Sequence, residues 1–181
     1  RPMASWKVAL KKVGFADMIE VGLGGDMTTQ SEAEEWLEAY KNGEKKTTSC
    51  CPAFVNMIRK HYPELSDNIS TTVSPMCMIS RMLKVKEPDC FTVFIGPCIA
   101  KKSEIQDQKI DGNADAVLTY SELRAIFRAK NVTLDAAEND YQESSSYGKR
   151  YGNAGGVTNA VLQYMKETDQ EADVKVCKAN G

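Results

Sequence analysis

Residues 91–104 read Phe-Thr-Val-Phe-Ile-Gly-Pro-Cys-Ile-Ala-Lys-Lys-Ser-Glu, and this segment indicates the fold class most clearly. Its first half, Phe91–Ile95, is an apolar run closed by Gly96-Pro97, which is typical of a buried strand. Cys98 lies in the turn that follows, and Ala114–Leu118 has the pattern of a second buried strand. Sites in open α/β sheets are built at the carboxyl ends of strands, so the turn at Cys98 is a candidate site.

Helical and strand patterns alternate along the chain, which predicts an α/β fold with parallel strands and helices on the sheet faces. Thr29 and Glu32 have the spacing of a capping box at the start of one helix, Ser74-Pro75 suits the start of another, and Ser121 is the predicted cap of a third. The predicted helices cover residues 3–13, 29–41, 53–61, 75–84, 122–130 and 157–166. Further strands are predicted over residues 18–23, 46–49 and 173–177.

The composition limits the classes of partner. The chain has 181 residues, 42% of them hydrophobic, which is enough for one domain or two small lobes. Lys and Arg number 23 against 25 Asp and Glu, and no basic stripe alternates with aromatic residues, so we expect no nucleic-acid partner. No apolar run approaches the ~20 residues of a membrane span and no signal peptide opens the chain, which predicts a cytoplasmic protein without a membrane span.

Six cysteines carry the strongest chemical signal. In a chain of this length without an export signal, reduced thiols that bind metal or react are expected rather than a disulfide framework. Cys51 and Cys98 are the candidate metal ligands, because both lie in turns with proline that follow predicted strands. A buried structural cysteine is the alternative for each of them, and it is the interpretation we adopt for Cys77, Cys90 and Cys177.

The neighbours of these two cysteines suggest further roles. Cys50 points away from Cys51 because consecutive side chains diverge, and a thiol beside a metal cluster suits proton delivery or redox protection. The ammonium of Lys101, three residues after Cys98, could bind an anionic ligand, although a surface lysine fits the pattern as well. Glu32 and Glu35 lie one helical turn apart, as a proton relay needs. The helical pattern does not separate them from Glu34 and Glu38, so all four also fit a solvated face.

Together these residues resemble the catalytic H-cluster domain of the iron-only (FeFe) hydrogenases. Residues 48–54 are similar to the family's first signature, Thr-Ser-Cys-Cys-Pro-x-Trp, and residues 97–104 to its second, Met-Pro-Cys-x-x-Lys-x-x-Glu. Another pattern of the family is Phe-Gly-x-Thr-Gly-Gly-Val, and residues 152–157 resemble its last six positions. The resemblance covers essentially the whole chain and implies parallel sheets flanked by helices in Rossmann-like lobes.

The resemblance implies a cofactor and its ligands. The family's H-cluster is a 4Fe–4S cubane held by four cysteines and joined through one thiolate to a di-iron centre with CO and cyanide ligands. Cys51 and Cys98 would be two of the cubane ligands, with Cα atoms predicted within about 10 Å of each other. Lys101 would donate a hydrogen bond to a cyanide. The other implied cofactor-binding residues are Gly96, Pro97, Met76 and Gly152.

The resemblance also implies an activity, the reversible reduction of protons to dihydrogen. Cys50 would pass protons to the di-iron centre, and the outward relay would run through Glu32, Ser70 and Glu35. Electrons would come from ferredoxin or an accessory iron–sulfur domain, and maturation proteins would supply the cofactor.

The sequence also departs from the family pattern. The third cysteine signature, Glu-x-Met-x-Cys-x-x-Gly-Cys, and the Ala/Pro-rich segment before the first helix are absent. We therefore expect residues 1–181 to be a partial H-cluster domain, truncated at both ends, apo or partly metallated and inactive alone. Gly96 replaces a methionine, Met76 a glutamine and Phe54 the signature tryptophan, changes that resemble divergent or sensory branches.

Two alternative functions remain open. One is a hydrogen-sensing regulatory protein with the same cofactor. The other is a non-catalytic iron–sulfur assembly protein of the hydrogenase-like type, which has no need of Cys50, Lys101 or the relay.

Overall fold

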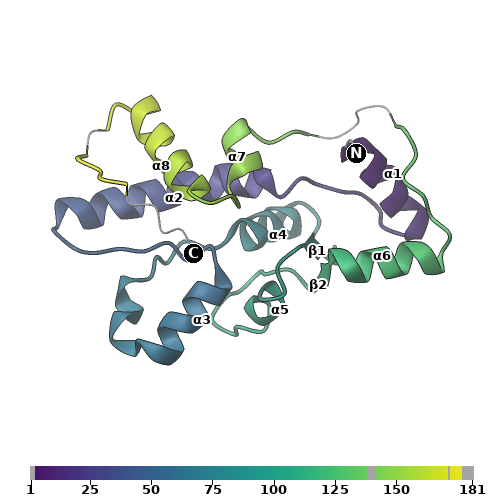
Figure 1. Ribbon diagram of the computed structural model, residues 1–181, viewed down its shortest axis with the longest axis horizontal. Coiled ribbons are helices and arrows are strands. Elements are labelled where there is room, and N and C mark those ends of the chain that lie inside the picture. Colours follow the sequence, from purple (N-terminus) through teal and green to yellow (C-terminus); the bar gives the residue numbers. More distant parts are fainter. Residues whose placement is uncertain (1–2, 138–141, 171, 177–181) are drawn as a thin grey trace. The chain divides into compact units, whose positions relative to one another are not determined.

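The computed structural model describes residues 3–137, 142–170 and 172–176 (Figure 1). Contacts between residues divide the chain into two compact units. Unit 1 comprises Arg1–Glu20 and Ser80–Glu143, and unit 2 comprises Val21–Ile79 and Ser144–Gly181.

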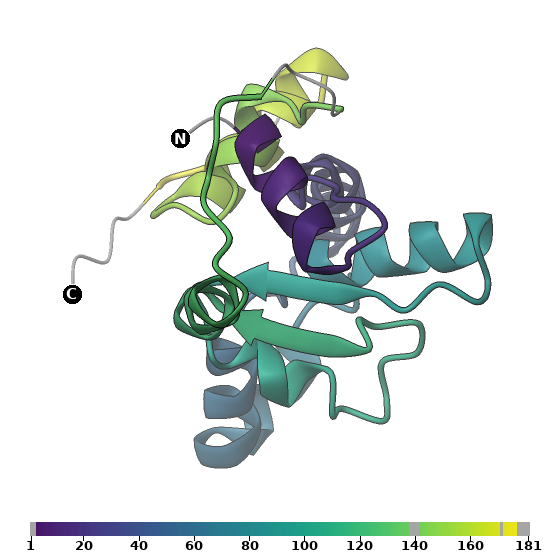
Figure 2. The ribbon, with the colours of Figure 1, turned by 90° about the vertical axis from the view of Figure 1, so that its right-hand side faces the viewer.

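Unit 1 is built on a parallel β-α-β arrangement. Strands β1 (Val93–Gly96) and β2 (Ala116–Thr119) pair in parallel, in register from Val93 opposite Ala116 to Gly96 opposite Thr119. The chain between them contains the short helix α5 (Lys101–Glu104). Figure 2 shows the two strands side by side, with the next helix continuing directly from the arrowhead of β2. The predicted α/β class and the two strands at residues 91–95 and 114–118 are confirmed, with each strand shifted by one or two residues.

Two helices supply the core of unit 1. Helix α1 (Met3–Val13) matches the predicted range and contributes Ala9 and Leu10, which pack against buried residues of α6 (Tyr120–Ala129). The ring of Trp6 stacks on Phe127, with 6.2 Å between the ring centroids.

The start of α6 differs from the prediction. The Thr119 side chain accepts a hydrogen bond from the Glu122 N–H, and the Glu122 carboxylate accepts one from the Thr119 N–H at 2.7 Å. This capping box fixes the first turn two residues earlier than expected, so the predicted cap at Ser121 was wrong.

Unit 2 is mainly helical. Helix α2 (Gly22–Lys41) contacts both α7 (Ser146–Arg150) and α8 (Gly156–Glu167), as Figure 1 shows. Helix α3 (Pro52–His61) packs on a 3-10 helix, η1 (Pro63–Asn68). Helix α4 (Pro75–Lys86) starts in unit 2 after Ser74, as predicted.

The predicted strand over residues 18–23 is wrong, because α2 begins at Gly22 and passes through Gly24-Gly25. A Cβ on Gly24 would lie 2.2 Å from the Pro75 carbonyl oxygen, and one on Gly22 would lie 2.3 Å from Ser144 Oγ. These glycines therefore allow α2 to pass close to its neighbours. The predicted capping box is also absent, since Thr29 Oγ1 donates to the Gly25 carbonyl oxygen within the helix.

The strands predicted over residues 46–49 and 173–177 do not form either. In place of a strand over residues 46–49, Thr47 forms one isolated parallel bridge with Ile69. Residues 172–176 contain no strand, and Cys177 lies outside the described residues. Helix α7 has no counterpart among the predicted helices.

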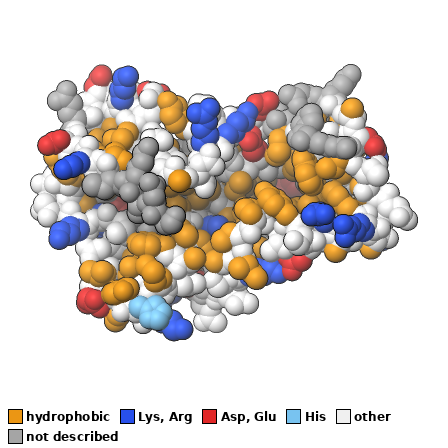
Figure 3. Space-filling view, viewed as in Figure 1, with side chains coloured by type: hydrophobic (Ala, Val, Ile, Leu, Met, Phe, Trp, Pro, Cys, Tyr) orange, Lys and Arg blue, Asp and Glu red, His pale blue; other side chains and the backbone are white. Residues whose placement is uncertain are grey.

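The hairpin of α3 and η1 has one buried face and one exposed face. Val55 and Ile58 pack with Ile69, whereas Met57, Tyr62 and Leu65 are exposed. Figure 3 shows hydrophobic side chains gathered over this hairpin.

Within residues 3–137, 142–170 and 172–176, no helix has both the length and the hydropathy that crossing a bilayer requires.

Candidate active site

The loop before α3 presents two thiols in different environments. Cys51 is the N-cap of α3, with extended backbone angles and an exposed side chain, and Pro52 occupies the first helical position. Cys50 is half-buried, and its Sγ lies 3.7 Å from Thr48 Oγ1. The backbone therefore turns one thiol outward and keeps its neighbour partly inside unit 2.

Cys98 belongs to unit 1. It lies two residues beyond the end of β1 and is half-buried, so its predicted place at the carboxyl end of a strand is confirmed. Cys51 follows only the isolated bridge of Thr47, so that part of the prediction is wrong for Cys51. The predicted separation of Cys51 and Cys98, which belong to different units, stays a prediction.

The described cysteines have the chemistry of ligands but do not form a complete metal site. None of Cys50, Cys51, Cys77, Cys90 and Cys98 is in a disulfide. Among the residues that the structure describes, no group of three or more His, Cys, Asp or Glu side chains could hold a metal ion. Cys77 is fully buried in α4, as expected of a structural cysteine, whereas Cys90 lies in a turn and not in a regular element.

Lys101, on α5, forms a buried ion pair. Its Nζ lies 2.6 Å from Glu104 Oε2, with 11% and 6% of the two side chains exposed. Three donor hydrogens on the ammonium allow it to bind a further acceptor while this pair persists. Glu104 was not singled out from the sequence, although it occupies the last position of the second signature and lies one helical turn from Lys101.

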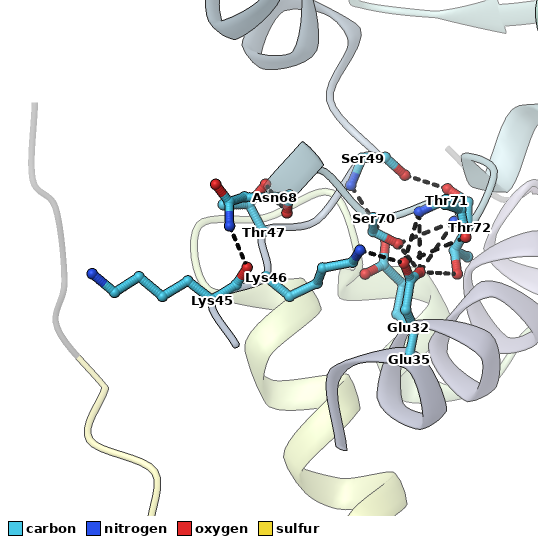
Figure 4. A network of polar contacts seen from close by, with 10 residues as sticks. All are labelled: Glu32, Glu35, Lys45, Lys46, Thr47, Ser49, Asn68, Ser70, Thr71 and Thr72. Atoms are coloured by element: carbon cyan, nitrogen blue, oxygen red, sulfur yellow. Dashed lines mark hydrogen bonds and ion pairs between the residues drawn. The ribbon is translucent and has the colours of Figure 1, made fainter. Parts of the chain in front are cut away.

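Glu32 and Glu35 point from α2 toward the segment 70–72, as Figure 4 shows. Glu32 is buried, with 4% of the residue exposed, and its Oε1 accepts a hydrogen bond from the Ser49 N–H at 3.4 Å. The Ser70 hydroxyl donates to Glu35 Oε2 at 2.5 Å. Glu34 and Glu38 are exposed, so the structure separates the four glutamates where the helical pattern did not.

Glu35 is held by a set of donors that the sequence did not reveal. The Thr71 N–H lies 2.9 Å from Glu35 Oε1, and the Thr72 hydroxyl lies 3.2 Å from Oε2. Lys46 forms an ion pair with Glu35 at 3.3 Å (Figure 4). The run Ser70-Thr71-Thr72 was the available signal, since each of these side chains carries a hydroxyl that can donate to a carboxylate.

The pKa values of the Glu32 and Glu35 carboxyl groups shift in opposite directions. Burial raises the pKa of Glu32 to about 7, the Ser49 N–H opposes that rise, and the Glu35 carboxylate adds to it. Burial also favours a higher pKa for Glu35, but hydrogen bonds from the Ser70 hydroxyl and the Thr71 N–H lower this pKa below its ordinary value. Below about pH 7 Glu32 is therefore mostly protonated, whereas Glu35 is ionised.

This arrangement predicts a pH-dependent stability. Because the folded-state pKa of Glu32 is raised, its contribution is fully present below about pH 4.5 and is lost as pH rises through about 7. Relative to Glu32→Gln, the wild-type full-length protein without cofactor should lose about 2–3 kcal/mol of unfolding free energy between pH 5 and pH 8. Urea denaturation at both pH values measures this, and Glu38→Gln is the exposed control. Parallel pH profiles for wild type and Glu32→Gln would contradict the assignment.

A cavity of about 360 Å³ lies beside the carboxyl pair. Glu32, Glu35, Lys46 and Ser70 form its polar side, and α8 contributes apolar side chains that include Val161. The cavity gives these polar groups a route to solvent or to small molecules.

The remaining predicted cofactor residues are placed as follows. Met76 is buried in the first turn of α4, and Gly96 ends β1, while Pro97 and Gly152 are exposed. A Cβ on Gly96 would lie 2.6 Å from the ring of Phe94. The Phe94 ring therefore fills the space that a longer side chain at position 96 would need.

Comparison with known families identifies the family of this chain. Residues 2–180 match the model for the iron only hydrogenase large subunit, C-terminal domain. The chain belongs to this family. It is 30% identical over 186 residues to iron hydrogenase 1 of Clostridium pasteurianum, covering 92% of this chain and 32% of that protein. It is 31% identical to the periplasmic Fe hydrogenase large subunit of Nitratidesulfovibrio vulgaris over 88% of this chain and 43% of the relative.

Other relatives and solved structures extend the comparison. The cytosolic Fe–S cluster assembly factor NAR1 of Kluyveromyces lactis is 25% identical over 70% of this chain and 29% of its own length. A variant of apo FeFe-hydrogenase HydA1 from Chlamydomonas reinhardtii superposes with a TM-score of 0.76 at 26% identity, over 98% of this chain and 51% of that one. The FeFe-hydrogenase HydA(deltaEFG), a structure on stepwise H-cluster assembly, has a TM-score of 0.78 at 25% identity, over 99% of this chain and 50% of that one. The chain thus spans about a third of iron hydrogenase 1 and half of these solved chains.

Proposed function

We propose that the protein containing this chain is an iron hydrogenase that reversibly reduces protons to dihydrogen, and that residues 1–181 are part of its H-cluster domain. Family membership supports the class of chemistry. The observation that carries the proposal is the buried Glu32 beside the Ser70–Glu35 hydrogen bond, because Ser49 connects this carboxyl group to the Cys50-Cys51 loop.

The side chains present fit part of the ligand set of the H-cluster. When bound, that group supplies the redox chemistry, with a di-iron centre joined to a 4Fe–4S cubane. Thiolates are the ligands that iron–sulfur clusters take, and the exposed Cys51 and half-buried Cys98 offer two of them. Lys101, held in place by Glu104, has an ammonium suited to an anionic ligand such as cyanide.

The protein's own residues would conduct protons. Glu35 takes a proton from the side of the cavity, and the Ser70 hydroxyl accepts it while giving its own proton to Glu32. Glu32 holds that proton near neutral pH because burial raises its pKa to about 7. It then passes the proton toward Cys50, whose thiol makes the last transfer. Because the pKa of Glu32 is higher than that of Glu35, the proton is held more firmly by Glu32, at the inner end of the relay.

Ser70→Ala should interrupt the relay without affecting the cofactor. Alanine leaves no hydroxyl between the two carboxyl groups, so we expect hydrogen evolution by the full-length, matured protein to fall roughly 100-fold, with iron content unchanged. Ser66→Ala on η1 is the matched control. Wild-type evolution rates in Ser70→Ala would show that protons take another route.

A second function has support from the comparisons. The similarity to NAR1 supports an iron–sulfur assembly role without hydrogen chemistry. The buried Glu32 and the Lys101–Glu104 pair favour the hydrogenase, since an assembly factor needs neither. A hydrogen-sensing branch would keep the same residues, and the Phe94 ring beside Gly96 favours a site that differs from the family pattern.

The remaining parts of the proposal come from the resemblance. They are ferredoxin or an accessory iron–sulfur domain as electron partner, and maturation proteins that deliver the cofactor. We also propose a cytoplasmic location, which the similarity to the cytosolic factor NAR1 supports.

A further inference from the structure

Tyr151 carries a buried hydroxyl that the relay described above does not use. It follows the last residue of α7, and 6% of the residue is exposed. Within the described part of the chain, its hydroxyl has no hydrogen-bond partner. Buried polar groups in native proteins are nearly always hydrogen-bonded, so this hydroxyl indicates a bound water molecule or ligand.

Close packing holds the Tyr151 side chain against α2. A Cβ on Gly25 would lie 3.1 Å from Tyr151 Cβ and 3.2 Å from Cγ, so the glycine gives the side chain room against the helix. A Cβ on Gly156 would lie 2.6 Å from the Tyr151 carbonyl oxygen, so the start of α8 closes over the backbone. The position of the ring is therefore fixed by three helices of unit 2.

The other end of α7 is also tied to α2. The Ser145 N–H donates to Asp26 Oδ2 at 2.8 Å, and the Ser145 hydroxyl caps α7. The segment that carries Tyr151 is therefore held against α2 at both of its ends.

Two groups of the proposed relay act on this hydroxyl. Burial raises the pKa of Tyr151 above its ordinary value, and negative charge on Cys50 or Glu32 raises it further. These groups come from separate elements, Glu32 from α2 and Cys50 from the loop before α3. The hydroxyl therefore stays a neutral donor. Gly25, against which Tyr151 packs, and the buried Glu32 are seven residues apart, about two turns of α2, so both lie on the same face of that helix.

Tyr151 is also a departure from the family pattern. It precedes Gly152 and so stands at the phenylalanine of the Phe-Gly-x-Thr-Gly-Gly-Val stretch. This chain therefore has a hydroxyl where that pattern has a plain aromatic ring.

We propose that Tyr151 is a positioning residue of the proton pathway, whose hydroxyl donates a hydrogen bond to a water molecule held between the Glu32 carboxyl group and the Cys50 thiol. Such a water molecule would have three polar partners, within the two to four that buried waters take. The proposal rests on the proposed function, because it assigns Tyr151 to the same relay. It adds that the hydroxyl keeps the inner carboxyl group and the thiol connected.

Tyr151→Phe in the full-length protein tests this, because it removes the hydroxyl and keeps the ring. In the matured protein we expect hydrogen evolution to fall about 10-fold with iron content unchanged. In the cofactor-free protein, losing the hydroxyl that holds this water molecule against ionised Glu32 should raise the pKa of Glu32 by about one pH unit. Infrared titration of the carboxylic acid band, assigned with Glu32→Gln, measures this pKa. Tyr147→Phe, a more exposed tyrosine of α7, is the control and should match wild type.

The outcomes separate the proposal from its alternatives. If Tyr151→Phe keeps the wild-type pKa of Glu32 and the wild-type turnover, Tyr151 only fills space, and the inference is wrong. An increase in Tm for Tyr151→Phe, without a change in that pKa, would likewise show an unpaired hydroxyl and overturn it. Loss of activity in Cys50→Ser and Glu32→Gln but not in Tyr151→Phe would reject this inference alone. Full activity in Cys50→Ser would reject the proposed function itself.

Discussion

Cys50→Ser in the full-length, matured protein is expected to lower hydrogen evolution by at least about 100-fold while the iron stays bound. The half-buried thiol is proposed as the last proton carrier, and a serine hydroxyl gives up its proton far less readily. The substitution changes one atom, and Cys51 next to it remains available as a ligand. Hydrogen evolution with a chemical reductant and iron per chain should be measured together.

Cys90→Ser is the matched control for this variant. Cys90 is also half-buried but lies in a turn before β1, outside the proposed relay. The Cys90→Ser protein should evolve hydrogen at the wild-type rate. If Cys50→Ser does the same, protons reach the metal centre by another route.

Cys51→Ser should instead remove the metal centre, leaving cubane iron and hydrogen evolution near background. Serine oxygen is a poor substitute for a thiolate toward iron–sulfur clusters. Cys51 is exposed at the N-cap of α3, where serine is a preferred residue, so the fold should be retained. Circular dichroism and Tm of the cofactor-free protein check this point. A Cys51→Ser protein that keeps full iron content would show that Cys51 is not a ligand.

The parts of the fold that follow from local pattern were predictable. Helices α1, α3 and α8 and the strands at Val93 and Ala116 have clear periodicity or apolar runs, and the structure has them within a few residues. The run Gly22-Leu-Gly-Gly was misread because glycine ends strands and helices in most sequences. Here glycine is needed for close contact with Pro75 and Ser144, which are distant in sequence.

The candidate site shows the same division. The turns around Cys51 and Cys98 and the position of Lys101 could be predicted, because the residues of each motif are close together in the sequence. The choice of Glu32 and Glu35 over Glu34 and Glu38 came only from the family resemblance, because it depends on where the segment 70–72 packs. Lys46 and Tyr151 acquire their contacts through tertiary structure, which no periodicity in the sequence specifies. Glu104, in contrast, contacts Lys101 within one helical turn, so the spacing of the second signature could have revealed it.

We propose that this chain is part of a hydrogen-converting protein and not of an iron–sulfur assembly protein. The most direct test is infrared spectroscopy and hydrogen evolution on the full-length protein produced together with hydrogenase maturation proteins. We predict absorption bands of metal-bound CO and cyanide together with dihydrogen evolution. A protein that binds cubane iron but shows neither these bands nor any dihydrogen would contradict the hydrogenase assignment and favour the assembly role.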